Sequence, residues 1–237
     1  HSLVLKIGGF DLPCVSFPGR KGMNETAKSA SRITTLLLLL AALLAVLPPM
    51  VIDVGRPSPV RSMESICMET SLETWTRQRG GEADAWWNPS WEGGEIRIEK
   101  PPLLVWLNMA AWSRLDPATA RMEDFAWRAR LMNILVVLIG LGALFGIGTV
   151  LYDRTTGFMA ALIAGSSYQL IKQSHYATYD AQLMGWATLS VALGIAAMRA
   201  GPGRAGRQVA FWILSALTLG AAMMTKGPIG AVWVVPP

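Results

Sequence analysis

Long uncharged stretches dominate the pattern of hydrophobic and polar positions along the chain. Those at residues 33–52, 131–152, 155–171, 181–198 and 208–225 are near the length of about 20 residues that crosses a bilayer as a helix. A sixth apolar run begins at Gly227 and continues to Pro237. The pattern predicts an all-α, polytopic membrane protein with about five to six transmembrane helices.

The two ends of the chain depart from this pattern. Residues 1–22 are mixed and aperiodic, and we expect them to be a non-native or disordered extension before Met23. Residues 23–237 are expected to form one transmembrane domain, truncated within the apolar run that ends the chain. The run at 33–52 exceeds the apolar core of a signal peptide, about 7–15 residues, and therefore favours an uncleaved span.

The connection between the first two spans, residues 53–130, is too long to be a passive loop in a compact membrane protein. Met68, Leu72 and Trp75 recur in it at helical spacing. A second apolar segment, residues 102–115, opens on a proline and is too short to span a bilayer. Both segments are expected to be amphipathic juxtamembrane helices on the membrane surface.

Composition supports the membrane assignment. The 237 residues are 52% hydrophobic and only 16% charged, whereas soluble domains carry about 25% charged residues. The net charge of +5 would favour a nucleic-acid partner if the basic residues were clustered. Instead they flank the spans, and twelve of the sixteen acidic residues lie between Asp53 and Asp124. This pattern reflects topology and argues against nucleic-acid binding. Two cysteines define no disulfide framework.

Basic residues near the span ends predict the orientation, because they accumulate on the cytoplasmic side. Lys28 and Arg32 precede the first span, Arg154 separates the second from the third, and three arginines lie within 199–207. With these inside, the loop at 53–130 lies outside. The start of the fourth span and the end of the fifth then share its side of the membrane.

Glu99 and Lys100 form the sharpest local feature of this loop, because two prolines and an apolar helix follow them. A lysine beside a helix N-terminus suits the phosphate of a lipid, since the free N–H groups there also favour an anion. Glu99 could bind a divalent metal or hold the lysine. A solvated charge pair before a helix is the alternative explanation.

Other ionisable residues fall on the same predicted side. Asp180 begins the fourth span and Lys226 ends the fifth, so they could pair and mark a site or serve only as a cap and a snorkelling side chain. Arg128 and Arg130 precede the second span as phosphate contacts or interfacial anchors. The candidate bases are Glu64, Glu69 and Asp53.

Several motifs in order resemble glycosyltransferase family 39, which includes bacterial aminoarabinose transferases of lipid A and relatives of the protein O-mannosyltransferases. The stretch IRIEKPPLLVWL at 96–107 resembles the family's loop motif. ARL at 129–131 resembles its entry to the second span, Tyr179-Asp180 its Thr-Asp pair, and MTKGP at 224–228 its Leu-Thr-Lys-Gly-Pro.

The resemblance implies a GT-C fold that moves a sugar from a polyprenyl-phosphate carrier to a lipid or protein hydroxyl. The active site would face outward from a bacterial cytoplasmic membrane. Lys100 would hold the carrier phosphate, with Arg128, Arg130 and Lys226 as further contacts. Asp180 would orient the sugar or acceptor. The resemblance leaves room for a divalent metal at Glu99 and implies no other cofactor.

One departure from the family pattern concerns the base. The family has an Asp-Glu pair followed by Arg-Tyr early in this loop, and only Glu64 matches it here. Glu64 is therefore the expected catalytic base, with Asp53 as the fallback. Two alternatives remain: a truncated, inactive member of the family, and a non-enzymatic transporter or assembly subunit, which would need ionisable residues near the bilayer midplane.

Overall fold

The structure is a computed structural model that describes residues 6–7, 10–11, 25–52, 54–55, 63–97, 99–116, 119–200 and 203–232. Asp53 and most of the expected N-terminal extension lie outside these residues. The chain divides into two units, His1–Leu37 and Leu38–Pro237. In the first, β1 (Lys6–Ile7) pairs antiparallel with β2 (Phe10–Asp11), and α1 (Glu25–Val51) begins; α1 then continues into the second unit.

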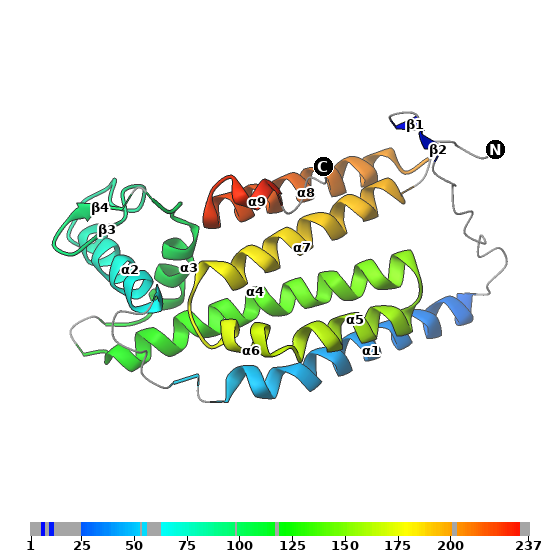
Figure 1. Cartoon of the computed structure of the whole chain (residues 1–237), viewed down its shortest axis with the longest axis horizontal. Helices are drawn as coiled ribbons and strands as arrows, with labels where there is room; N and C mark the ends of the chain where they lie inside the picture. The colour runs from blue at the N-terminus through cyan, green and yellow to red at the C-terminus, as the bar shows by residue number, and fades with distance from the viewer. Residues whose placement is uncertain are drawn as a thin grey trace. The chain divides into compact units, whose positions relative to one another are not determined.

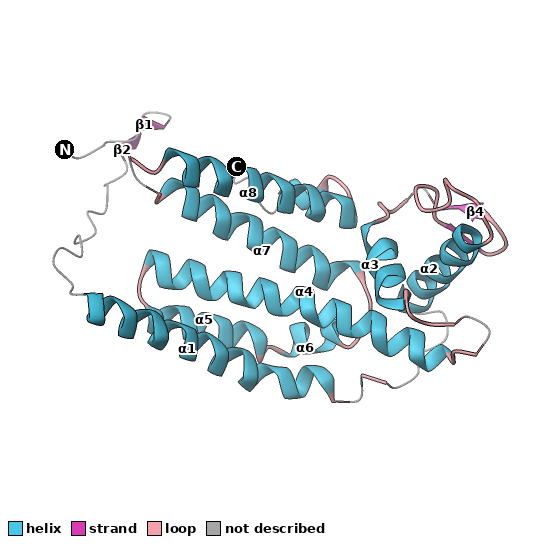
Figure 2. Cartoon of the chain, turned by 180° about the vertical axis from the view of Figure 1, so that it is seen from behind, coloured by secondary structure: helices cyan, strands magenta, loops and turns pink. Residues whose placement is uncertain are grey.

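The second unit is a helical bundle with a smaller body at one end (Figure 1). The bundle contains the rest of α1, α4 (Met122–Leu151), α5 (Arg154–Gly165), α6 (Tyr168–Ser174), α7 (Tyr179–Met198), α8 (Ala205–Lys226) and α9 (Ile229–Val232). Helix α4 packs against both α5 and α7, and α7 packs against α8. Figure 2 shows the same layers from behind, with α4 between α7 and α5.

Four helices of the described residues are long and apolar enough to cross a membrane: residues Ala30–Val51 of α1, and α4, α7 and α8. They coincide with the first, second, fourth and fifth predicted spans. Helix α4 begins nine residues before the predicted span, because a capping box closes its first turn: the Arg121 N–H donates to Asp124 Oδ2 at 2.9 Å. Its polar first turns therefore extend the helix beyond the apolar run.

The third predicted span is not one helix, which corrects the sequence-based expectation. It divides into α5 and α6 at Ser166 and Ser167. The Ser167 hydroxyl donates to the Ala164 carbonyl at 2.7 Å and accepts from the Leu170 N–H at 3.4 Å, so it closes one helix and caps the next. The two short helices together return the chain along α4 (Figure 1).

Glycine pairs allow the helices of the bundle to approach closely. A Cβ on Gly140 of α4 would lie 2.8 Å from the Cα of Gly185 on α7, and one on Gly148 would lie 2.7 Å from the Cα of Gly157 on α5. Small residues are common where membrane helices pack, because association there depends on close van der Waals contact. The two pairs fix α4 between its neighbours.

The smaller body, which we call the loop body, comprises α2 (Met63–Arg79), the hairpin of β3 (Ser90–Trp91) and β4 (Glu95–Ile96), and α3 (Leu103–Trp112). Trp75, Trp112 and Phe125 form its aromatic centre, with ring centroids 5.2–6.1 Å apart. Trp112 is fully buried and donates to the Phe125 carbonyl.

The helices of the loop body differ from the expected surface helices in what they bury. Met68 and Trp75 face the core as their spacing predicts, yet α2 also buries Glu64, Thr70 and Thr74. Its buried surface is therefore partly polar. It contacts α3 and β3, and Glu64 reaches Arg130 of the bundle. The loop body is a small packed unit, held by internal contacts rather than only by a membrane surface.

Candidate functional site

The candidate residues gather at one end of the bundle, which we call the loop end. It contains the loop body, the starts of α4 and α7, and the end of α8 (Figure 1). Helix α3 contacts α8, so the segment that follows Lys100 lies against the helix that ends on Lys226.

The chain that leads into α7 is held by side-chain to backbone contacts with two other helices, α4 and α1. Asn133 Nδ2 of α4 donates to the carbonyls of Gln173 and Tyr176 at 3.2 and 2.8 Å. His175 Nε2 lies 2.8 Å from the Pro49 carbonyl of α1. These contacts fix the start of α7, and with it the position of Asp180.

Asp180 and Lys226 form an ion pair between the first turn of α7 and the last residue of α8. The Asp180 side chain is 52% exposed and that of Lys226 is 29% exposed, so both charges remain accessible from solvent. The positive end of the α7 dipole stabilises the carboxylate, and the negative end of α8 stabilises the ammonium. The expected pairing of these two residues is thus present in the structure.

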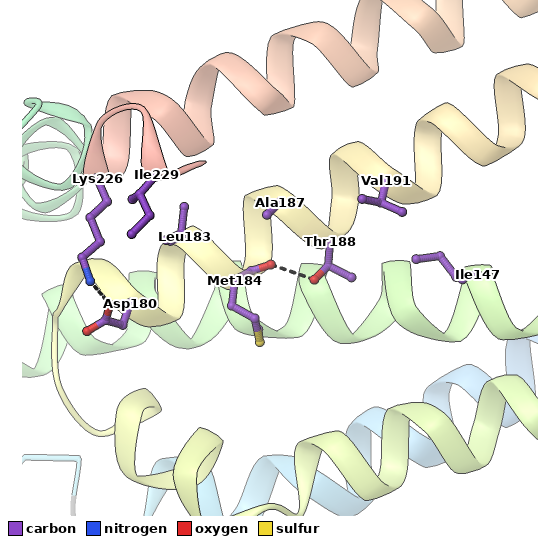
Figure 3. Close-up of a pocket in the computed structure, with 9 residues that line it drawn as sticks. All are labelled: Ile147, Asp180, Leu183, Met184, Ala187, Thr188, Val191, Lys226 and Ile229. Atoms are coloured by element: carbon purple, nitrogen blue, oxygen red, sulfur yellow. Dashed lines mark hydrogen bonds and ion pairs between the residues drawn. The ribbon is translucent and has the colours of Figure 1, made fainter. Parts of the chain in front are cut away.

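A cavity of about 480 Å³ extends from this ion pair along α7 (Figure 3). Beyond the ion pair its walls are apolar side chains and one threonine, contributed by α4, α7 and α9: Ile147, Leu183, Met184, Ala187, Thr188, Val191 and Ile229. The Thr188 hydroxyl donates to the Met184 carbonyl within its own helix at 2.8 Å. The cavity therefore has a charged head at the loop end and an apolar body along the bundle.

Glu64 and Arg130 form a buried ion pair instead of lying open to a substrate. Arg130 Nε and Nη2 donate to the two carboxylate oxygens of Glu64, each at 2.8 Å, and the side chains are 1% and 3% exposed. Glu64 also accepts the Ala177 N–H at 2.8 Å, while Arg130 Nη1 donates to the Val54 carbonyl. This geometry joins α2, α4 and the α7 entry. The ion pair occupies the polar atoms that a base at Glu64 and a phosphate contact at Arg130 would use, and both roles stay predictions.

Two prolines separate Lys100 from Leu103, the first residue of α3. Lys100 is half-buried and makes no hydrogen bond or ion pair with any residue that the structure describes. Glu99 beside it is exposed. The N-cap of α3, Pro102, makes no side-chain cap, so the first N–H groups of the helix are available for an external acceptor.

The remaining candidates lie in different surroundings. Arg128 is half-buried, and its Nε has no hydrogen-bond partner in the described part of the chain. Because it stands two residues from Arg130 on α4, it faces a different side of the helix. Glu69 is exposed on α2.

The divalent metal expected at Glu99 stays a prediction. Within the described ranges, no three side chains of His, Cys, Asp or Glu gather into a group that could hold an ion. A lone exposed carboxylate binds a divalent cation weakly, because such cations take several oxygen ligands. We therefore derive no step through a metal.

Arg97 is a candidate that the sequence analysis did not single out. It is only 7% exposed, and its Nη1 donates to Thr70 Oγ1 at 3.2 Å. The buried thiol of Cys67 packs against Tyr179, the residue before Asp180, and lies close enough to Arg97 to feel its charge. Burial raises the pKa of Cys67 to about 11, so the thiol is neutral near pH 7. The position of Arg97 three residues before Lys100 was the available signal in the sequence.

Comparison with known proteins identifies a family whose model covers the helices that carry Asp180 and Lys226. The family model described as dolichyl-phosphate-mannose-protein mannosyltransferase matches residues 103–236. The match includes Asp180 and Lys226 and begins just after Lys100. No curated protein matches the sequence.

Two crystal structures of ArnT from Cupriavidus metallidurans share the fold. The apo structure gives a TM-score of 0.61 at 20% identity over 86% of this chain, and the structure bound to undecaprenyl phosphate gives 0.61 at 21% identity over 83%. The matched parts are 34% and 33% of those chains, so this chain spans about a third of their length. The likeness confirms the all-α, polytopic membrane fold that the sequence predicts.

Proposed function

Because the chain belongs to the dolichyl-phosphate-mannose-protein mannosyltransferase family, we propose that it forms part of a membrane glycosyltransferase. The enzyme takes a sugar from a polyprenyl-phosphate carrier and transfers it to a hydroxyl of a lipid or protein acceptor. It resides in the bacterial cytoplasmic membrane, with the loop end on the outer face, because the basic residues flank the opposite ends of the spans.

The cavity at Asp180 and Lys226 carries this proposal. A polyprenyl phosphate has an anionic head and a long apolar chain, and the cavity has a lysine at its mouth and apolar walls along α7. An apolar pocket with a few polar groups at one end is typical of a binding site for such a ligand. The bound neighbour from Cupriavidus metallidurans holds undecaprenyl phosphate, which agrees with a ligand of this class.

Lys226 and Lys100 have the chemistry to hold the phosphate. Lys226 closes the head of the cavity, and Lys100 has no competing partner among the described residues. The open N–H groups at the start of α3 add further donors beside Lys100. Arg128, with an unpartnered Nε, is a further candidate contact.

Transfer breaks the bond between the sugar's anomeric carbon and the phosphate oxygen and forms a bond to the acceptor oxygen. Positive charge develops on the sugar and negative charge on the departing phosphate, as in other glycosyl transfers. Fixed ammonium groups stabilise that phosphate, so it leaves without a proton donor. The acceptor proton passes to a carboxylate. Asp180 orients the sugar or the acceptor, while Asp53 and Glu69 are the proposed bases, since Glu64 is paired with Arg130.

The test is sugar transfer in nanodiscs by the intact protein and three lysine variants. Lys100→Ala and Lys226→Ala should each lose on the order of 100-fold in rate, because each removes a contact that strengthens in the transition state. Lys172→Ala is the matched control, an exposed lysine in the last turn of α6 outside the cavity. Transfer by Lys100→Ala and Lys226→Ala at the rate of the control would refute the phosphate roles.

A further inference from the structure

Arg97 is a buried cation that forms no ion pair with a carboxylate among the described residues. In the described part of the chain, its side chain donates a hydrogen bond to Thr70 and lies near Cys67. The Trp91 ring centroid lies 5.7 Å from the guanidinium carbon. An arginine stays charged at any physiological pH. Burying that charge without an anion is costly, so a gain elsewhere is expected to offset it.

Arg97 is close to Lys100 along the chain, and its backbone is fixed by a hydrogen bond. Its N–H donates to the Pro89 carbonyl at 2.7 Å, which closes the hairpin of β3 and β4 next to the strand end. Lys100 follows three residues later, a reach of at most about 10 Å in an extended chain. The contacts that fix Arg97 therefore limit where Lys100 can lie.

The same guanidinium is connected to the start of α7. Cys67 contacts both Arg97 and Tyr179, and it packs with Tyr179 and Leu104 in one buried cluster. Asp180 is the next residue along α7 and contacts Lys226. Arg97 thus lies between the loop that carries Lys100 and the helix that carries the Asp180–Lys226 pair.

We propose that Arg97 is a positioning residue, which holds Lys100 in register with the Asp180–Lys226 pair so that the lysines bind one phosphate together. The inference rests on the proposed function. The guanidinium acts through its contacts with Thr70 and Cys67 and does not itself touch the phosphate. Because lysine lacks the planar fork of arginine, charge alone cannot replace it.

The experiment measures sugar-transfer kinetics and undecaprenyl phosphate binding for the intact protein with Arg97→Met or Arg97→Lys. We expect Arg97→Met to raise KM for the donor and the Kd for undecaprenyl phosphate by on the order of 10- to 100-fold, the scale of a misplaced contact. Rate at saturating donor should fall as well, because a misplaced Lys100 also loses its contact in the transition state. Arg97→Lys should recover only part of the affinity. Arg79→Met is the matched control, since Arg79 also stacks on a tryptophan of the loop body, at 4.4 Å.

A chemical rescue separates positioning from a loss of folding. Arg97→Ala supplied with guanidinium ion at a non-denaturing concentration should regain donor affinity, whereas Lys100→Ala should not. Donor affinity in Arg97→Met equal to that of Arg79→Met, or Arg97→Ala without rescue, would overturn the inference. A wild-type protein that fails to bind undecaprenyl phosphate would instead refute the proposed function.

Discussion

Glu64 and Arg130 show what a sequence can and cannot say about a single charged residue. Their positions in an outer loop and at a span entry identify them as candidates for chemistry. Sequence gives no distance between residues 66 positions apart, and their bidentate contact depends on how α2 packs against α4. By contrast, the pairing of Asp180 with Lys226 could be predicted, because both are ionisable residues at span ends on one predicted side.

Replacing Glu64 tests its structural role. Glu64→Gln removes a carboxylate that neutralises buried Arg130, and breaking such a pair costs about 3–5 kcal/mol. We therefore expect a marked loss of thermal stability in detergent, measured by tryptophan fluorescence. The double variant Glu64→Met/Arg130→Met should recover much of it, since no buried charge is left unpaired.

A Glu64→Gln variant of normal stability would instead bear on the identity of the catalytic base. A Glu64→Gln protein that melts like the wild type, binds donor normally and transfers no sugar would restore Glu64 as the catalytic base. It would also make the contact with Arg130 a device that orients the carboxylate.

At the scale of elements, four of the first five predicted spans match helices and one does not. The sixth apolar run continues past Val232 and lies partly outside the described residues. Apolar length identifies a span, and α4, α7 and α8 have that length without interruption. The break between α5 and α6 depends on hydroxyl contacts of Ser166 and Ser167 with carbonyls three residues earlier. Serine also occurs within intact helices, so its presence alone does not predict the break.

Contact between α4 and α7 can be tested at Gly185. A Cβ there would lie 2.5 Å from the Val136 carbonyl oxygen, so Gly185→Ala forces the helices apart. We expect a loss of about 1–3 kcal/mol in stability, as for other overpacked sites. Gly146→Ala is the control on α4, because a Cβ there meets nothing within 4 Å. Equal thermal midpoints for the two variants would contradict the close packing.

At the scale of the whole molecule, the placement of the loop and the span ends agrees with the charge pattern of the sequence. Alternation of the spans predicts that the loop, the start of α7 and the end of α8 share one side, and the structure places them at one end of the bundle (Figure 1). The loop body could not be predicted in the same way. Its polar buried contacts, such as Asn108 Nδ2 to Ser71 Oγ at 3.0 Å, follow from tertiary packing and not from apolar periodicity.

Cysteine labelling of intact cells tests the orientation. In a background with Cys14 replaced by serine, Asp84→Cys should react with a membrane-impermeant maleimide and Arg204→Cys should not, because residue 84 lies in the loop body and 204 precedes α8 at the opposite end. The native Cys67 is buried and should stay unlabelled. Labelling at 204 but not at 84 would reverse the orientation.

Binding of undecaprenyl phosphate to the intact protein, with variants at both members of the Asp180–Lys226 pair, tests the central claim most directly. If the donor phosphate takes Lys226, it competes with the Asp180 carboxylate for the ammonium. Lys226→Met should then weaken binding about tenfold or more, since a charge-assisted contact is lost. Asp180→Asn should strengthen binding while sugar transfer falls, because it frees the lysine and removes the orienting carboxylate. Unchanged binding by Lys226→Met, together with weaker binding by Asp180→Asn, would contradict a phosphate site at the head of this cavity.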